Sequence, residues 1–227
     1  MAITLGSTGI TFNDGTTQTS RYEDQLDKGK LLSISSYTVA GSYTWNKPVG
    51  CTSILVRAVG GGGGASGYCE SGGAGGFAER LIDVTSVTSV AVTVGAGGAG
   101  TAYVGTTGGL STGGGTSSFG SYITATGGFG SNRNYNHTGG HGGVGSGGNI
   151  NLYGGTGTGH TNSVGNGAVA RGGESYFGGG AGANRANATG KNGNGAPGSG
   201  GAGNRTDDGS AAGGQGEDGA VIIWEYK

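Results

Sequence analysis

Three histidines and a few carboxylates are the side chains in the glycine-rich part of this chain that could bind a metal or catalyse a reaction. His137 and His141 lie four residues apart, but this spacing brings two ligands together only on a helix, and the glycines around them rule a helix out. Asp207 and Asp208 lie in Asn-Arg-Thr-Asp-Asp-Gly, which is typical of a turn. No serine or cysteine nucleophile has a base placed beside it. We therefore predict no enzyme activity, no catalytic residue, no metal site and no cofactor.

Two other uses of these side chains stay open. Copies of the chain in an oligomer could bring histidines such as His160 together in a metal site, because histidine is a common metal ligand. Asp207 could pair with a distant carboxylate in a carbohydrate groove, as a glycosidase requires. Without either arrangement, we expect solvent-exposed loop histidines and aspartates that form turns.

Residues 95–100 read Gly-Ala-Gly-Gly-Ala-Gly and match the G-x-G-x-x-G pattern of dinucleotide-binding loops. Such a site also needs a helix directly after the glycines, since the pyrophosphate is bound at the helix N-terminus. The residues that follow, 101–109, do not have the composition of a helix. With 61 glycines in the chain, this match is expected by chance, and we predict no dinucleotide.

Six polar stretches interrupt the glycine-rich part and combine tyrosine, asparagine, histidine and arginine with small residues. This composition is typical of recognition loops, in which tyrosine gives a large contact area and asparagine and arginine direct hydrogen bonds. Ordinary solvated turns would contain fewer aromatic residues and arginines. We therefore predict binding through these stretches, and the candidate residues are Tyr68, Tyr103, Asn132, Arg133, Tyr135, His137, His160, Asn162, Asn184, Arg185, Asn187, Lys191, Arg205 and Asp207.

The glycine-rich part that must position these stretches runs from Gly60 to Gly219, between apolar runs at 54–59 and 220–226. Glycine recurs at every third position in places, as at 139, 142, 145 and 148, and three residues per turn is the period of polyproline II. A row of glycines clears one side of such a rod, so that another backbone can approach. The sequence predicts a bundle of short rods, packed backbone to backbone and clamped at one end by strands.

Apolar and polar stretches alternate between the glycine runs, which indicates a chain that runs up and down. We expect the aromatic stretches around Phe119, Tyr153 and Tyr176 at the sheet end and the polar stretches at the other end. Collagen is excluded, because it needs strict Gly-X-Y repeats and abundant proline, and this chain has two prolines. Disorder is the other alternative for a glycine-rich chain. The flanking strands and the spaced aromatic residues argue against it.

Alternation of apolar and polar residues predicts further strands at 77–84 and 89–94. The fold class that we predict is all-β: a small β-sandwich or sheet clamping a bundle of glycine-rich polyproline II rods, with a short N-terminal β segment. Residues 1–36 form that segment and a charged connector, and residues 37–227 form the glycine-rich domain with its distal recognition loops. The N-terminal segment is too small to bury a core alone, so we expect it to pair with copies of itself or with a partner.

Composition excludes several classes of partner. The net charge is −1 and 11% of the residues are charged, so there is no positive field to hold nucleic acid or an anionic membrane. No apolar run is long enough for membrane insertion, and the N-terminus lacks the layout of a secretory signal. Cys51 and Cys69 are the only cysteines, and reduced thiols are favoured over a disulfide.

Residues 37–227 resemble the glycine-rich domain of bacteriophage tail fibre proteins, a family that includes receptor-binding adhesins. The most specific pieces are GTSSFGS (115–121), SYFGGG (175–180) and VIIWEY (221–226). ITFNDGTTQTS (10–20) resembles a short motif that is common in tail-fibre trimers. The resemblance implies a polyproline II sandwich whose distal loops contact a host surface receptor, either an outer-membrane protein or a polysaccharide.

The resemblance also implies a virion protein that is made in the host cytoplasm, forms a homotrimer through its N-terminal part and contacts other tail proteins there. Whether the chain is a whole fibre or the tip of another fibre stays open. A structural tail or baseplate protein that docks another virion protein is the alternative. An ice-binding protein is a third interpretation, but it would need flat, regular threonine surfaces, against which the arginines and tyrosines of the polar stretches argue.

Overall fold

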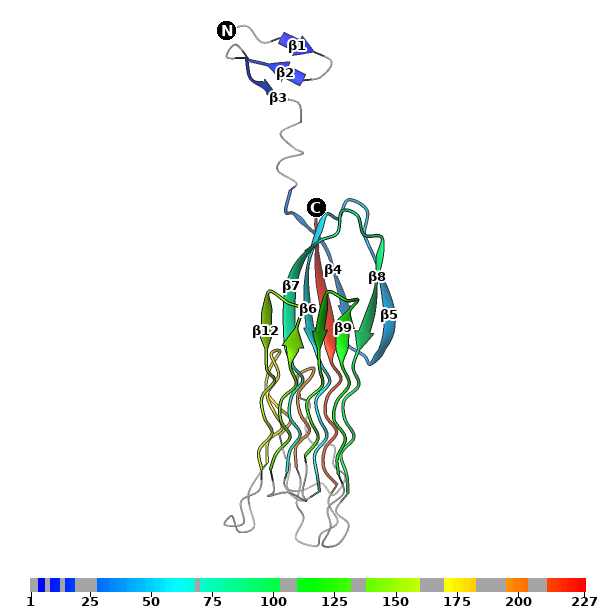
Figure 1. The fold of residues 1–227 in the computed structure, drawn as a ribbon, viewed down its shortest axis with the longest axis vertical. Coiled ribbons are helices and arrows are strands. Elements are labelled where there is room, and N and C mark those ends of the chain that lie inside the picture. Colours follow the sequence, from blue (N-terminus) through cyan, green and yellow to red (C-terminus); the bar gives the residue numbers. More distant parts are fainter. Residues whose placement is uncertain are drawn as a thin grey trace.

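The computed structural model describes residues 4–6, 9–12, 15–18, 28–67, 70–102, 110–131, 138–159, 170–182, 195–203 and 212–227. Within these ranges every regular element is a β-strand, and there is no helix. Two five-stranded antiparallel sheets form a sandwich, and long glycine-rich segments extend from one end of it (Figure 1). The all-β prediction is confirmed.

A separate three-stranded sheet lies near the N-terminus, with the order β1-β2-β3. Its strands are Thr4–Gly6 (β1), Gly9–Thr11 (β2) and Thr17–Gln18 (β3). Leu5 pairs with Ile10 in the antiparallel β1–β2 ladder. Gly15 lies in the turn before β3 with a φ of 80°, a conformation that other residues adopt only at a cost in energy.

The first sheet of the sandwich has the order β12-β7-β6-β13-β4, and the second has β11-β10-β9-β8-β5. The strands of the first are Ile150–Leu152 (β12), Phe77–Asp83 (β7), Ser53–Val59 (β6), Ala220–Tyr226 (β13) and Leu31–Tyr37 (β4). Those of the second are Gly145–Ser146 (β11), Ile123–Ala125 (β10), Ser117–Phe119 (β9), Ser89–Val94 (β8) and Gly41–Asn46 (β5). The chain crosses between the sheets at both edges, from β4 to β5 and from β11 to β12.

Four of these strands, β6, β7, β8 and β13, fall where the apolar patterns predicted them. β4 begins at Leu31, inside the segment that the sequence assigned to the connector. Its partner is β13, at the other end of the chain, with Ser35 paired to Ile223. Long-range pairing of this kind leaves no signal in the local sequence.

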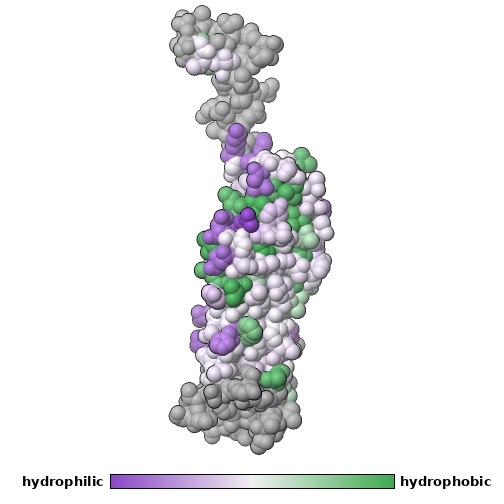
Figure 2. All heavy atoms as spheres, in the orientation of Figure 1, coloured by the Kyte–Doolittle hydropathy of each residue, from purple (hydrophilic) through white to green (hydrophobic). Residues whose placement is uncertain are grey.

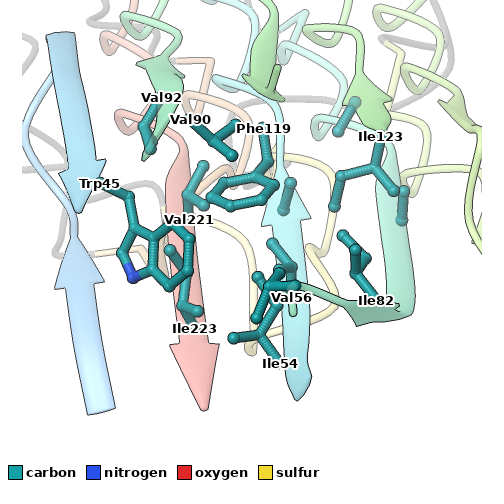
Figure 3. Packing of buried hydrophobic residues seen from close by; sticks show 14 of the residues in the cluster. Trp45, Ile54, Val56, Ile82, Val90, Val92, Phe119, Ile123, Val221 and Ile223 are labelled. Atoms are coloured by element: carbon teal, nitrogen blue, oxygen red, sulfur yellow. The ribbon is translucent and has the colours of Figure 1, made fainter. Parts of the chain in front are cut away.

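Every second side chain along the strands points into the space between the sheets and fills it (Figure 3). β8 shows the pattern most clearly, because its residues alternate between exposed and buried along the whole strand. Trp45 and Phe119 meet edge to face, with their ring centroids 5.7 Å apart. Burying each large apolar side chain of this kind contributes about 1.5–3 kcal/mol. The sandwich therefore has an ordinary apolar core.

One carboxylate lies inside this core. Glu225 in β13 is 1% exposed and accepts hydrogen bonds from Nε1 of Trp45 at 2.7 Å and from the hydroxyl of Ser35 at 2.8 Å, while the Ser33 hydroxyl also donates to it. These bonds join β13 to β4 in its own sheet and to β5 in the other. A buried carboxylate needs such donors, and here they fix the edge where the two sheets meet.

Burial alters the acidity of two groups near this edge. Burial, and then the negative charge of Glu225, raise the pKa of Tyr37 above its ordinary value of 10.0. Burial is also the main cause that raises the pKa of the Cys51 thiol above 9.0. Cys51 is a free, buried cysteine, and Cys69 lies outside the described residues.

Two fully buried segments, 60–65 after β6 and 71–76 before β7, form the centre of the glycine bundle. Successive N–H groups of 60–65 donate to three neighbouring segments in rotation. The donor–acceptor pairs are Gly60 to Gly76 (3.0 Å), Gly61 to Gly115 (2.9 Å), Gly62 to Glu217 (2.9 Å), Gly63 to Gly73 (2.8 Å), Gly64 to Thr112 (2.9 Å) and Ala65 to Gly214 (2.9 Å). Every third residue therefore contacts the same neighbour.

The carbonyl groups of the same segment accept bonds from three further segments. The pairs are Gly128 to Gly61 (2.9 Å), Ser131 to Gly64 (3.1 Å), Gly98 to Gly62 (2.8 Å), Thr101 to Ala65 (3.0 Å) and Gly201 to Gly63 (2.9 Å). Six neighbours thus surround 60–65, and these bonds satisfy backbone groups that have no access to water. A β-sheet gives each strand only two hydrogen-bonded neighbours.

Glycine is required at most positions where two of these backbones meet. A Cβ on Gly60 would lie 2.2 Å from the carbonyl oxygen of Thr126, and one on Gly63 would lie 2.1 Å from that of Phe129. Such distances are impossible for real atoms, so a side chain at these positions would push the segments apart. Residues 60–64 are accordingly all glycine, whereas the buried Ala65 and Ala74 show that a few positions in the two central segments accommodate a methyl group.

Outer segments combine glycine pairs with single larger residues, and the exposed positions recur every third residue. In 138–144, the exposed residues are Thr138, His141 and Val144, and glycines occupy the positions between them. A Cβ on Gly142 would lie 1.8 Å from the carbonyl oxygen of Gly154, and one on Gly143 would lie 2.2 Å from that of Thr126. In each group of three residues, two positions therefore pack against neighbouring segments and the third faces solvent.

Candidate functional site

None of the fourteen predicted binding residues belongs to the described part of the chain. They fall in the ranges 68–69, 103–109, 132–137, 160–169, 183–194 and 204–211, whose structure is not described. The residues that flank these ranges are described, and they show where each range is attached. For five of the six ranges, both flanking residues lie at the end of the bundle far from the sandwich.

Backbone pairing joins several of these flanks. Ser66 forms a parallel bridge with Thr101, and Ala102 forms an antiparallel bridge with Ala212. The N–H of Ser66 donates to the carbonyl of Glu70 at 2.9 Å, which closes the chain around 68–69. The ranges 68–69, 103–109 and 204–211 are therefore attached to one connected set of residues.

Serine side chains connect the next flanks. The hydroxyl of Ser111 lies 2.9 Å from the carbonyl oxygen of Gly64 and 2.9 Å from that of Ser131, and it can donate a hydrogen bond to either. Ser131 is itself only 1% exposed. This contact holds Ser111, the second residue after 103–109, beside Ser131, the residue directly before 132–137.

Ser71 and Thr158 connect the remaining distal flanks. The Ser71 hydroxyl accepts a bond from the N–H of Gly203 at 3.0 Å, and its own N–H donates to Thr158 at 3.0 Å. The Thr158 hydroxyl accepts from the N–H of Arg171 at 2.8 Å, which holds the two sides of 160–169 together. These small hydroxyl residues were not predicted from the sequence, although their positions at the ends of glycine runs are a signal that could have identified them.

The sixth range, 183–194, is attached differently. Ala196 donates to Gly179 at 3.2 Å, and Gly198 donates to Asp218 at 2.7 Å. Asp218 also accepts the N–H of Ala40, in the β4–β5 crossing, so the far side of this range begins next to the sandwich. A turn at Pro197 and Gly198 lies here, at the sheet end.

The aromatic stretches lie at the sandwich end. Phe119 belongs to β9, and Tyr153 follows β12. Tyr176 stacks on Phe77 of β7, with the ring centroids 3.6 Å apart and the planes inclined by 13°. Apolar side chains thus gather where the sheets supply a surface to pack against.

Among the residues that the structure describes, no group of three His, Cys, Asp or Glu side chains could hold a metal ion. Glu70, at the far end, is fully buried and bonded by the Ser66 hydroxyl, while His141 is exposed on an outer segment. The described ion pair joins Arg57 and Glu79 at 2.5 Å on the outer face of the sandwich. A search of the described residues for helices able to cross a membrane finds none.

A family model described as a glycine-rich domain matches residues 38–226. The chain belongs to this glycine-rich domain family. The match begins directly after β4, so it covers the other nine strands of the sandwich together with all the segments of the bundle. A comparison of this chain with curated proteins finds no match.

Proposed function

We propose that this chain is a receptor-binding protein of a bacteriophage tail fibre, which attaches the virion to the host cell surface through the distal segments of its glycine-rich domain. The proposal rests on the difference between the two ends of the domain. At the sandwich end, Gly29 donates to Lys227 at 2.6 Å and Lys227 donates to Lys30 at 3.0 Å, so the chain enters and leaves there. Five of the polar ranges are attached at the opposite end. A domain that is attached at one end and carries polar stretches rich in tyrosine and arginine at the other suits recognition.

The glycine segments are, in this proposal, polyproline II rods. The rotation of hydrogen-bond partners with a period of three supports this, because polyproline II has three residues per turn and no internal hydrogen bonds. The exposure pattern of 126–131 and 138–144, which repeats every three residues, supports it independently. Rods bonded on several sides form a stiff base, so distal loops would lose little conformational entropy on binding.

The proposed receptor-binding residues are the fourteen predicted from composition, with tyrosine and arginine as the main anchors. The receptor is an outer-membrane protein or a polysaccharide of the host. The N-terminal segment would attach the chain to other tail proteins and form a homotrimer, which strengthens weak contacts through effective concentration. The protein would be made in the host cytoplasm and would act in the virion.

Binding of the purified, fluorescently labelled full chain to a panel of bacterial strains tests this function. We expect binding to some strains and protection of those strains from the phage that encodes the chain. Replacing 132–137 and 183–192 with Gly-Ser sequences of equal length should abolish binding and leave the melting temperature nearly unchanged. A matched control is Val49→Ser, in a fully exposed turn of the sandwich. Binding to no strain, or full binding after both replacements, overturns the proposal.

A structural tail or baseplate protein is the second candidate, and the outer face of the first sheet favours it. Cross-strand pairs align four apolar residues there, which we term the apolar row: Ile34, Trp224, Leu55 and Leu81. Ile34 is 53% and Leu81 is 61% exposed, and Figure 2 shows hydrophobic residues on the surface of the sandwich. Such a row suits contact with another protein. If Leu81→Asp prevents incorporation into virions while strain binding is unaffected, both functions hold; loss of incorporation without any strain binding favours the structural one.

A further inference from the structure

Three neighbouring outer segments, 126–131, 138–144 and 153–159, form one side of the glycine bundle. Phe129 donates to His141 at 2.9 Å and Thr126 donates to Val144 at 2.9 Å, which places the first two segments side by side. Gly157 donates to Gly140 at 2.9 Å, and Val144 forms a bridge with Tyr153, which places the third beside the second. The outward positions of all three therefore share one surface, here termed the lateral strip: Thr126, Phe129, Thr138, His141, Val144, Tyr153 and Thr156.

Large side chains distinguish this strip from the other outward positions of the bundle. Phe129 is 62% exposed and Tyr153 is 78% exposed. Elsewhere, the exposed positions of the described segments are mainly small or polar, such as Ala96, Ala99 and Gln215, and Leu110, which is 59% exposed, is an exception. In Figure 2 the bundle is mostly pale, with isolated hydrophobic and hydrophilic residues.

The fold does not need these rings. The backbones of the strip are held by hydrogen bonds between glycine-rich segments, and threonine or alanine occupies the equivalent outward positions of neighbouring triplets, such as Thr126 and Thr112. Removing the apolar surface of an exposed phenyl ring from water is favourable, and contact with a ligand would provide that burial. Rings held on a stiff backbone also lose little entropy when they bind.

The chemistry of the strip indicates the ligand. It contains no Lys, Arg, Asp or Glu, and it combines aromatic faces with hydroxyl groups and an imidazole. An aromatic face carries negative potential that attracts weakly positive C–H groups, as the apolar face of a sugar ring presents. Threonine, tyrosine and histidine can donate to and accept from sugar hydroxyls. The charged residues begin on the next segment, where Glu174 accepts a bond from Gly155 at 3.0 Å and Arg171 lies beside Thr158.

We infer that the lateral strip binds a neutral polysaccharide of the cell surface, with Phe129 and Tyr153 stacking on sugar rings. This rests on the proposed attachment function and extends it from the distal end to the side of the bundle. The strip begins at Thr138 and at the 126–131 segment, which flank 132–137, and it reaches Tyr153 next to β12. A long saccharide chain can therefore contact several positions along it.

Affinity electrophoresis of the full chain in gels that contain dextran, mannan or neutral bacterial capsular polysaccharides tests the strip. We expect retardation by at least one neutral polysaccharide, and a loss of about tenfold or more in affinity for Phe129→Ala combined with Tyr153→Ala. The matched control is Val39→Ala, whose side chain is 65% exposed in the β4–β5 turn, and it should bind normally. Retardation by none of the gels, or equal retardation of the double variant, overturns the inference.

Strain binding separates this inference from the attachment function. Periodate destroys sugars on cells and protease destroys surface proteins. The difference in cell binding between the wild type and the double variant should vanish after periodate treatment and persist after protease treatment. Cell binding that the double variant retains in full overturns the lateral strip and leaves distal attachment intact, whereas absence of cell binding overturns attachment itself. A change in oligomeric state of the double variant in sedimentation would instead assign the strip to contact between copies, which also overturns the inference.

Discussion

In the sandwich, the rings of Trp45 and Phe119 meet edge to face, and the backbones on either side are kept apart by side chains. In the bundle, the N–H of Gly61 meets the carbonyl of Gly115 at 2.9 Å with no side chain between the two segments. The first region excludes water with apolar surface, and the second uses hydrogen bonds that point in several directions around each segment. Glycine weakens a region where side chains provide cohesion, because it has no side chain to pack, but it is needed at the close contacts where backbones provide cohesion.

The centre of the bundle should therefore be sensitive to a single added methyl group. Gly62→Ala would place a Cβ 1.8 Å from the carbonyl oxygen of Ser199 at the centre of the bundle. We expect a loss of stability above about 3 kcal/mol or no folding, because several backbones must move at once. Thermal and urea unfolding measure the loss.

Gly179→Ala is the matched control, since a Cβ there has no atom within 4 Å. It should be neutral or stabilise by about 0.4–1 kcal/mol through the unfolded state. Equal effects of the two substitutions would contradict close backbone packing.

The core of the sandwich should tolerate loss of side-chain volume less well than the bundle surface does. Phe119→Ala removes a fully buried ring and should cost about 3–5 kcal/mol, measured by urea unfolding. Thr112→Val, on an outer segment, removes only the hydroxyl that accepts the N–H of Ala99 at 2.7 Å and should cost about 0.5–1.5 kcal/mol. A larger loss for Thr112→Val would mean that the bundle depends on side chains after all.

Glu225 tests whether polar contacts also contribute inside the sandwich. Trp45→Phe removes the Nε1 donor and leaves the carboxylate with serine donors alone, which should cost about 1–3 kcal/mol. A double-mutant cycle with Glu225→Gln separates this coupling from the change in ring size. Tyr43→Phe, which removes an exposed bond to Val39, is the control and should have a small effect. Zero coupling in the cycle would show that the bond contributes nothing.

Alkaline pH should produce the smallest effect, and one confined to the sandwich. The raised pKa values of Tyr37 and Cys51 mean that both groups hold their protons more tightly in the folded protein. Their contribution is fully present below their unfolded pKa values, and it is lost as pH rises through the higher folded values. The melting temperature should therefore begin to fall above pH 9.0, the ordinary value for the Cys51 thiol. Tyr37→Phe with Cys51→Ala should flatten that fall; an unchanged slope would assign it to other groups.

The sequence predicted the features that depend on local period. Period two predicted the strands at 77–84 and 89–94, which are β7 and β8, and apolar runs predicted those at 54–59 and 220–226, which are β6 and β13. Glycine at every third position, as at 139 and 142, indicated a backbone-packed side of the bundle. The sequence predicted a single row of glycines that lets one neighbouring backbone approach each rod. The structure shows why outer segments carry glycine pairs instead: Gly142 and Gly143 face two different neighbours.

Features that depend on distant partners were not predictable. β4 forms because β13 lies beside it, and Glu225 needs Trp45 and Ser35 from other strands. The serine contacts at the far end, such as Ser111 with Ser131, join residues that no local pattern connects. The fourteen candidate binding residues stay predictions, and what the structure adds is the position of the residues that flank them.

Hydrogen exchange of the amides of 60–65 tests most directly whether backbone hydrogen bonds hold the bundle together. Each of these amides donates at 2.8–3.0 Å to a neighbouring segment, although none belongs to a strand. We predict that they exchange as slowly as the amides of β6, which directly precedes them. Exchange of 60–65 at the rate of an unstructured glycine peptide, while β6 stays protected, would contradict the account.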